Sequence, residues 1–124
     1  VTDEGLYANE LAPRVQNSGR WAIVGAVCAQ LENHIRAVAG LPLGSTEVVR
    51  PTVMINIIGQ YPQSEQVLAL EGVHLHLYNK EEREGRKIGH LTLMPNDTAQ
   101  LTMLCRQLAK ILPNPLALSE DMTI

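Results

Sequence analysis

Phenylalanine is absent from this chain of 124 residues, and one tryptophan and three tyrosines are its only aromatic residues. A hydrophobic core must therefore be built from aliphatic side chains, which the hydrophobic content of 45% can supply. No apolar run approaches the roughly 18 to 20 residues that a membrane-spanning helix needs, and no signal peptide is visible. The net charge of −3 offers no general attraction to nucleic acid or to a membrane surface, so we expect neither as a partner.

Cysteine is also scarce. Cys28 and Cys105 lie far apart, in helix-like patterns and without the CxxC spacing of a metal or redox site. Buried thiols that act as small hydrophobic side chains are therefore favoured over a disulfide or a metal site. This use of cysteine fits a reducing, cytoplasmic location. The length allows one domain or less, and because the chain opens on Val1 we interpret it as a fragment of a longer protein.

Hydrophobic periodicity predicts both strands and helices. Alternating or β-branched runs predict strands at residues 1–8, with a turn at residues 3–5, and at residues 53–58, 73–79 and 88–94. Helical spacing of apolar residues begins at residue 26, and Gly40 followed by Pro42 ends that helix. A second helix is predicted to begin after Asp97, its N-cap, and to end at Pro113.

Three segments have no clear period. Residues 15–25 are expected to be irregular, residues 61–66 to form a polar connection and residues 80–87 to form a charged hairpin loop. Together the elements predict an α+β fold, in which a strand-and-helix piece of a larger sheet precedes a small antiparallel sheet packed by the final helix. The expected divisions are residues 1–44, residues 45–112 and a loose tail, 113–124.

Residues that suit a metal ion or a phosphate follow the first predicted strand. Asn9 and Glu10 stand at its end, Pro13 stops it, and Arg14 follows. A carboxylate beside an amide, with a guanidinium nearby, suits Mg²⁺ and polyphosphate oxygens. Glu10 is therefore the leading candidate metal ligand, although the same residue types also fit a strand edge with a solvated carboxylate.

The turn that follows could bind an anion. Arg14 offers a guanidinium fork for phosphate or bicarbonate oxygens. The turn Asn17-Ser18-Gly19 could expose backbone N–H groups to the same ligand. Solvation at the surface is the alternative for such an arginine.

The loop between the last two predicted strands is highly charged. Within eight residues it carries four cations and three glutamates: Lys80, Glu81, Glu82, Arg83, Glu84, Arg86 and Lys87. Composition alone favours a solvated hairpin tip. A rigid hairpin with two cations could instead neutralise a dianion.

Strand 73–79 alternates cleanly, with His74, His76 and Tyr78 on the face opposite its apolar residues. A His-x-His pair can bind zinc, but no further cysteine or carboxylate follows at a convincing spacing, even with His90. Histidines on the polar face of the sheet are therefore favoured over a metal site.

Several ordered strings resemble the C-terminal third of the N5-carboxyaminoimidazole ribonucleotide synthetase family, the ATP-grasp subunit of the purine-pathway carboxylase system. The strings are Asn9 to Arg14 with the turn Asn17-Ser18-Gly19, Gln30 to Gly44, Pro51 to Gly59, Val73 to Lys80, and Gly85 to His90. The resemblance covers nearly the whole chain, from residue 4 to residue 112. It implies the C-terminal piece of an ATP-grasp domain followed by a small antiparallel β domain with a packing helix.

The resemblance also implies an activity. Such a ligase uses ATP to phosphorylate bicarbonate, and the resulting carboxyphosphate carboxylates 5-aminoimidazole ribonucleotide in purine biosynthesis. ATP and Mg²⁺ would be its cofactors, bicarbonate and the ribonucleotide its substrates, and a homodimer its expected assembly. Asn9 and Glu10 would bind ATP, and Glu10 would also bind the metal. A partner glutamate of Glu10 is expected upstream of Val1, so we expect the 124-residue chain alone to be inactive.

The remaining roles follow in the same way. Arg14 and Gln16 occupy catalytic positions, and the residues implied to contact the substrate are Arg14, Asn17, Ser18, Gly19, Lys80 and Arg86. Of these, Lys80 and Arg86 would bind the 5′-phosphate of the ribonucleotide.

The chain departs from the family pattern at three positions. Gln16 and Arg20 stand where the family usually has histidine, and Glu84 stands where it usually has proline. Gln16 can hydrogen-bond but cannot titrate near neutral pH. Glu84 adds a negative charge beside the expected phosphate site and should weaken it.

Two other functions stay open. Formate-dependent glycinamide ribonucleotide transformylase shares the Asn-Glu and Ala-Pro-Arg strings, but its turn typically has Asp-Thr-Gly where this chain has Asn17-Ser18-Gly19. A divergent, non-catalytic binding domain would explain Gln16, Arg20 and Glu84. The residues that precede Val1 would separate these hypotheses.

Overall fold

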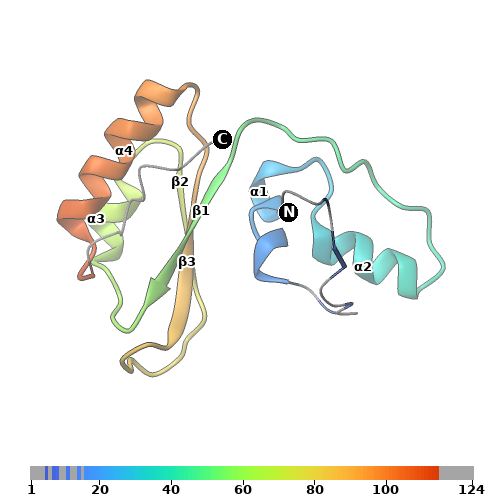
Figure 1. The fold of residues 1–124 in the computed structure, drawn as a ribbon, viewed down its shortest axis with the longest axis horizontal. Coiled ribbons are helices and arrows are strands. Elements are labelled where there is room, and N and C mark those ends of the chain that lie inside the picture. Colours follow the sequence, from blue (N-terminus) through green and yellow to red (C-terminus); the bar gives the residue numbers. More distant parts are fainter. Residues whose placement is uncertain (1–4, 6, 9–10, 12–13, 15, 115–124) are drawn as a thin grey trace.

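The computed structural model describes residues 5, 7, 8, 11, 14 and 16–114, and they form two parts joined by the segment 39–52 (Figure 1). The first part holds a 3₁₀ turn, η1 (Asn17–Gly19), and the helices α1 (Ala22–Gly25) and α2 (Gln30–Val38). The second part holds β1 (Val53–Ile58), α3 (Ser64–Leu68), β2 (Val73–Leu77), β3 (Lys87–Leu93) and α4 (Thr98–Ile111). The strand predicted at residues 1–8 lies mostly outside the described residues and stays a prediction.

The three strands form one antiparallel sheet in the order β1-β3-β2, so β3 is central. Its register places Leu91 between Ile55 and Leu75, and His90 between Asn56 and His76. Because side chains alternate along a strand, the first set faces one side of the sheet and the second set the other. The sheet therefore has one aliphatic face and one polar face.

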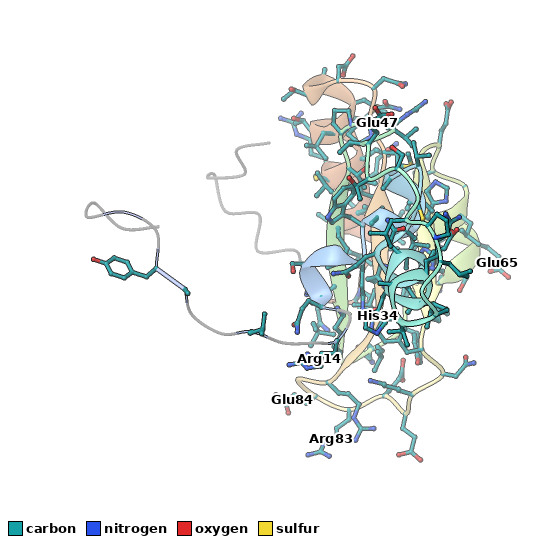
Figure 2. The ribbon with its side chains drawn as sticks, turned by 90° about the vertical axis from the view of Figure 1, so that its right-hand side faces the viewer. Arg14, His34, Glu47, Glu65, Arg83 and Glu84 are labelled. Atoms are coloured by element: carbon teal, nitrogen blue, oxygen red, sulfur yellow. The ribbon has the colours of Figure 1, made fainter. Side chains whose placement is uncertain are left out.

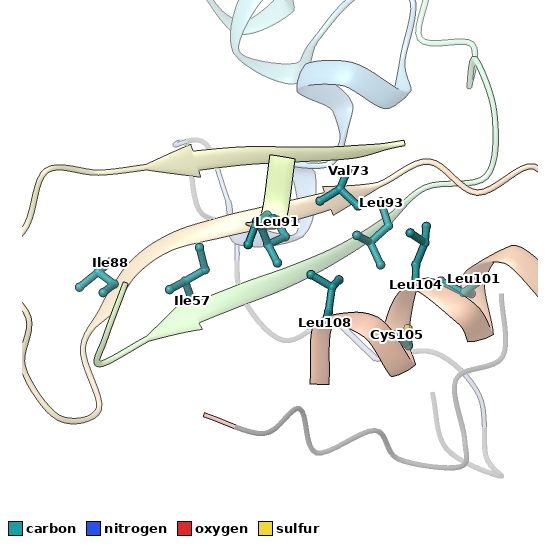
Figure 3. Packing of buried hydrophobic residues seen from close by; sticks show 10 residues of the cluster. Ile57, Val73, Ile88, Leu91, Leu93, Leu101, Leu104, Cys105 and Leu108 are labelled. Atoms are coloured by element: carbon teal, nitrogen blue, oxygen red, sulfur yellow. The ribbon is translucent and has the colours of Figure 1, made fainter. Parts of the chain in front are cut away.

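The aliphatic face packs against α3 and α4 (Figure 1). Figure 3 shows Leu101, Leu104 and Leu108 of α4 directed toward the sheet. The buried cluster contains no aromatic side chain and consists of Ile57, Val67, Val73, Ile88, Leu91, Leu93, Leu101, Leu104, Cys105 and Leu108. Leucine, isoleucine and valine thus fill the core in place of phenylalanine, as expected from the composition.

The start of α4 confirms the predicted cap. The Asp97 carboxylate accepts a hydrogen bond of 2.7 Å from the backbone N–H of Gln100, and the Gln100 side chain accepts one of 2.6 Å from the N–H of Asn96. Strand β1 matches its predicted bounds, and β2 and β3 differ from theirs by one or two residues. The α+β fold, with a small antiparallel sheet and a packing helix, is confirmed.

Three local predictions are wrong. The segment predicted to be irregular, residues 15–25, contains η1 and α1 in its described part. The connection predicted at residues 61–66 contains the start of α3 at Ser64. The helix predicted from residue 26 begins only at Gln30. Ala26 is instead extended and pairs with Val48, and the N–H groups of Val27 and Cys28 donate to the carbonyls of Glu47 and Ser45.

Both thiols are free and buried, which confirms their prediction as small apolar side chains. The Cys28 Sγ lies 3.3 Å from the Asn33 side-chain oxygen, and burial raises the pKa of Cys105. The apolar stripe of α2, in contrast, is exposed: Leu31, Ile35 and Val38 are all at the surface. In the part of the chain that is described, no helix has the length and apolar character to cross a membrane.

The first part of the chain meets the polar face of the sheet. Helices α1 and α2 lie on the side of the sheet opposite α3 and α4 (Figure 1). The Arg20 guanidinium, just after η1, stacks over the Tyr78 ring that follows β2. Gly25 also packs closely on Thr52, since a Cβ at Gly25 would lie 2.5 Å from the Thr52 hydroxyl. This meeting point is where the polar side chains gather.

Candidate functional site

Two histidines and a tyrosine form the centre of the polar face. The antiparallel register pairs His76 with His90, and their rings stack with centroids 4.5 Å apart at an angle of 10°. The Tyr78 hydroxyl lies 2.6 Å from Nδ1 of His90. His90 is 1% exposed, so this hydrogen bond is made beneath the surface. The location of these residues on the polar face, predicted from alternation, is confirmed.

Three cations surround the Tyr78 ring. The Arg20 guanidinium carbon lies 4.9 Å from the ring centroid, and the ammonium groups of Lys80 and Lys87 lie 5.5 and 5.9 Å from it. They come from three segments: the end of η1, the hairpin loop and the start of β3. We call these six residues the Tyr78 cluster: Arg20, His76, Tyr78, Lys80, Lys87 and His90.

Several polar atoms of the cluster are buried without a partner. The Lys87 ammonium and the Nε2 atoms of His76 and His90 have no hydrogen-bond partner among the residues that the structure describes. Such atoms are rare in folded proteins because each carries a desolvation cost of about 1–3 kcal/mol, and more when charged. A bound ligand or ordered water would satisfy these atoms.

The pKa values follow from this environment. Burial lowers the pKa of His90 to about 4, and the nearby His76, Lys87 and Arg20 act in the same direction. Burial, then Arg20 and Lys80, lowers the pKa of Lys87. Burial, then His74 and Arg20, lowers the pKa of His76. Burial raises the pKa of Tyr78, against the effect of Arg20. At neutral pH the histidines and the tyrosine are therefore uncharged.

Among the described residues, no carboxylate forms an ion pair with these cations. Within the described ranges, the ion pair found is the surface pair Arg36–Glu32 on α2. The same ranges contain no group of three histidine, cysteine or acidic residues that could hold a metal ion. Three cations around a neutral ring are a charge arrangement that suits an anion.

The hairpin loop that carries Lys80 is held by Tyr61. The Tyr61 hydroxyl accepts a hydrogen bond of 2.9 Å from the N–H of Lys80 and donates one of 2.7 Å to its carbonyl. The Glu82 carboxylate accepts from the N–H of Tyr61 at 2.6 Å. These contacts fix the backbone of Lys80, while its ammonium stays exposed near Tyr78.

The tip of the same loop is a tight turn. The N–H of Arg86 donates to the carbonyl of Arg83 at 3.0 Å, and Gly85 between them has φ of 70°. A positive φ only at the third residue defines a type II turn, which favours glycine there. Figure 2 shows Arg83 and Glu84 at this tip.

The structure describes some of the site residues predicted from the sequence but not others. Asn9 and Glu10 lie outside the described residues, so their roles stay predictions. Arg14 is exposed, and its guanidinium donates to the Gln16 side-chain oxygen at 3.3 Å. The Nε2 of Gln16 is buried without a partner.

The turn Asn17-Ser18-Gly19 has the predicted compact form. Its N–H groups are partly used inside the turn, because Gly19 donates to Gln16 and Arg20 donates to Asn17. Gly19 lies against the end of the exposed Gln30 side chain, which would have to move if Gly19 carried a Cβ. Whether the remaining N–H groups bind an anion stays a prediction.

Lys80 joins the Tyr78 cluster, but Arg86 is not one of the cations around the ring. Sequence reasoning did not assign a binding role to Lys87, Tyr78 or Arg20. One usable signal was present, namely the alternation that puts His76 and Tyr78 on one face. The approach of Arg20 has no local signal.

The fold and the cluster define a small α+β domain with a cation-lined polar face. Residues 52–103 match the sequence model of the phosphoribosylaminoimidazole carboxylase C-terminal domain. The chain is 58% identical over 99 residues to N5-carboxyaminoimidazole ribonucleotide synthase of Pseudomonas aeruginosa, covering 80% of this chain and 28% of that protein.

Solved structures that resemble this chain include proteins with similar names. The N5-carboxyaminoimidazole ribonucleotide synthetase of Thermus thermophilus matches with a TM-score of 0.80 and 48% identity, over 86% of this chain and 29% of that one. The Aspergillus clavatus N5-carboxyaminoimidazole synthase, in complex with ADP and 5-aminoimidazole ribonucleotide, matches with a TM-score of 0.69 and 31% identity, over 78% of this chain and 28% of that one.

These matches confirm the resemblance, found in the sequence, to the C-terminal part of N5-carboxyaminoimidazole ribonucleotide synthases. The chain spans less than a third of the length of the relatives described above, and the match lies in the part that carries their C-terminal domain.

Proposed function

We propose that this chain is the C-terminal part of an ATP- and bicarbonate-dependent ligase that carboxylates 5-aminoimidazole ribonucleotide. The observation that supports this most strongly is the cation-lined Tyr78 cluster on a fold shared with a relative in complex with ADP and that ribonucleotide. Three cations that pair with no carboxylate among the described residues suit a substrate that carries a phosphate. Bicarbonate as co-substrate and a homodimer as the assembly are part of the same proposal.

In this proposal Lys80 and Arg86 bind the 5′-phosphate, and Arg14, Gln16 and the turn Asn17–Gly19 face the reacting groups. Lys80 is suited to the task because Tyr61 holds its backbone while its ammonium stays exposed. Gln16 can orient a substrate through its amide but cannot transfer a proton near neutral pH.

Mg²⁺ and ATP would be held by Asn9 and Glu10. The donor set fits, since a carboxylate and an amide oxygen are ligands that Mg²⁺ accepts, with nucleotide phosphates completing its shell. When bound, Mg²⁺ offsets the charge that develops on the transferred phosphoryl group. One such carboxylate is half of the expected site, so we also propose that the 124-residue chain alone does not hydrolyse ATP.

A chimera tests the proposal. This chain would replace the matching C-terminal part of the Pseudomonas aeruginosa synthase, and ADP formation would be measured with and without the ribonucleotide. We expect ribonucleotide-dependent ADP formation. Glu10→Gln should lower turnover by at least about 100-fold, because it removes one charged contact to the metal.

Glu65→Gln is the matched control, since Glu65 is exposed on α3 and the change is chemically the same. Normal turnover of the Glu10→Gln chimera at saturating Mg²⁺ would make Glu10 a solvated strand-end carboxylate. Formate-dependent turnover would favour the transformylase alternative. A chimera that binds ligands without turnover would favour a non-catalytic binding domain.

The phosphate contacts have their own test in the chimera. Lys80→Ala or Arg86→Ala should raise the KM for the ribonucleotide about 10- to 100-fold, the equivalent of about 1.5–3 kcal/mol for a charged hydrogen bond. The KM for ATP should change little, because the ATP contacts lie elsewhere. Equal effects on both substrates would indicate a folding defect in the hairpin.

A further inference from the structure

We propose that Arg20 and Lys87, which have no assigned role, bind a phosphate monoester together with Lys80 beside the Tyr78 ring. The inference rests on the proposed function in one respect, namely that the phosphate is the 5′-phosphate of the ribonucleotide. It adds two ligands, one just after η1 and one from β3, to a site otherwise expected only in the hairpin loop.

The first argument is the state of Lys87. Its ammonium is buried and has no hydrogen-bond or ion-pair partner within the described residues. A buried charge without a partner is strongly destabilising, and proteins rarely keep one unless something binds it. The stacked histidines His76 and His90 do not neutralise the Lys87 charge, because a neutral imidazole carries no negative charge.

The second argument is convergence. Arg20 lies about sixty residues before Lys80 and Lys87 in the sequence, yet all three cations lie within 6 Å of one ring centroid. Because like charges repel, three cations this close to one another are unfavourable unless an anion lies among them. In the part of the chain that the structure describes, no carboxylate pairs with any of the three.

The third argument is the match of charge and geometry. Three cations and no carboxylate suit a dianion better than a single carboxylate, which would leave two positive charges in excess. A phosphate monoester is close to a dianion at pH 7. The stacked Arg20 guanidinium can keep its ring contact while its N–H groups face phosphate oxygens, since guanidinium groups combine both contacts.

Binding of ribose 5-phosphate to the 124-residue chain tests the inference, by titration calorimetry and by amide NMR shifts at low ionic strength. We expect shifts around Arg20, Tyr78 and Lys87. Arg20→Gln and Lys87→Met should each weaken binding about 10-fold or more, which is the loss of one charged contact.

The matched controls carry the same substitutions at Arg106 and Lys110, which are exposed on α4, and this helix lies on the side of the sheet opposite α1 and α2 (Figure 1). Arg106→Gln and Lys110→Met should leave the affinity within about 2-fold, because they change net charge equally but lie elsewhere. Lys87→Arg, which keeps a cation, should retain most of the binding. Free ribose should not bind, and inorganic phosphate should compete.

Equal affinity of Arg20→Gln, Lys87→Met and the control variants would overturn the inference, as would absence of ribose 5-phosphate binding by the unaltered chain. Competition by acetate as strong as that by inorganic phosphate would overturn the assignment of a dianion. Because this experiment needs no turnover, an inactive chimera would count against the proposed function, while binding that depends on Arg20 and Lys87 would still support this site.

Discussion

The Tyr61 hydroxyl makes two hydrogen bonds to the backbone of Lys80, accepting from its N–H and donating to its carbonyl. Tyr61 lies in the connection between β1 and α3, so this contact ties the hairpin loop to the edge of the sheet. The backbone of Lys80 is thus held in place, while its side-chain ammonium can still reach a ligand. Tyr61 is therefore a positioning residue for the proposed phosphate site and does not itself belong to the Tyr78 cluster.

Tyr61→Phe should loosen the hairpin loop without leaving a cavity in the core, because the ring is kept and only the hydroxyl is lost. We expect the amide hydrogen of Lys80 to exchange about 10-fold faster, while that of Tyr78, which donates to Ile88, stays protected. Each lost bond should cost about 0.5–1.5 kcal/mol. Affinity for ribose 5-phosphate should fall several-fold by calorimetry.

Thr102→Val is the control for Tyr61→Phe, since it removes a hydroxyl that donates to the Thr98 carbonyl on α4. It should leave ribose 5-phosphate affinity unchanged. Unchanged Lys80 exchange in Tyr61→Phe would show that the loop is held by other contacts.

Glu84→Pro should stabilise the chain. Glu84 is the second residue of the type II turn between Arg83 and Arg86, and proline is favoured at this position. Because proline restricts the unfolded chain, the gain should be about 0.4–1 kcal/mol, seen as a rise of a few degrees in Tm. Removing the carboxylate should also strengthen ribose 5-phosphate binding.

Glu84→Ala separates the two effects, because it removes the charge without restricting the backbone. It should strengthen binding and leave Tm nearly unchanged. A fall in Tm for Glu84→Pro would mean that the turn cannot accept the proline ring.

Local sequence signals were sufficient for the elements that pack the core. The β-branched run between Pro51 and Gly59 predicted β1, and the Asp97 cap with leucines at helical spacing predicted α4. Both signals are local and agree with the tertiary packing, which is why they succeeded. The short helices α1 and α3 were missed because so few residues form no helix alone and depend on tertiary contacts.

The Tyr78 cluster could be predicted only in part. Alternation placed His76 and Tyr78 on one face, but the pairing of His76 with His90 depends on the register across a nine-residue loop, residues 78–86. The stacking of Arg20 on Tyr78 depends on how the first part of the chain meets the sheet. Neither relationship is local, so periodicity alone could not reveal the buried ammonium of Lys87.

His90 should make the fold less stable in acid. Its pKa is lowered to about 4 in the fold, against an ordinary value near 6.5 in the unfolded chain. The unfolded state therefore binds more protons below pH 6.5, so stability is complete above that pH and is lost as the pH falls toward 4. A pKa difference of about 2.5 corresponds to roughly 3 kcal/mol.

Urea denaturation followed by circular dichroism between pH 4 and pH 8 measures this loss. His90→Gln should flatten the profile, whatever its effect on stability at pH 8. His34→Gln is the control, because His34 is exposed on α2, and it should leave the slope unchanged. The same slope in His90→Gln as in the unaltered chain would assign the acid sensitivity to other groups, of which His76 is the nearest.

Lys87 should impose an alkaline limit on phosphate binding. Burial, Arg20 and Lys80 lower its pKa below that of an ordinary lysine, and only its ammonium form attracts the ligand. A phosphate monoester is already close to a dianion at pH 7, so affinity should be greatest near neutral pH and fall as Lys87 loses its proton. The fall should begin at a lower pH than for an ordinary lysine, whose pKa is about 10.4.

Dissociation constants for ribose 5-phosphate between pH 7 and pH 10 check this expectation, with about a 10-fold loss of affinity across the range once the charged contact is gone. Lys87→Arg should remove the alkaline fall, because a guanidinium stays protonated throughout. Tyr78 should not contribute to the alkaline fall in affinity, since its pKa is raised and its hydroxyl stays neutral over most of this range. If Lys87→Arg keeps the alkaline fall unchanged, Lys87 does not contact the phosphate, and the affinity would have to depend on Lys80 and Arg20 alone.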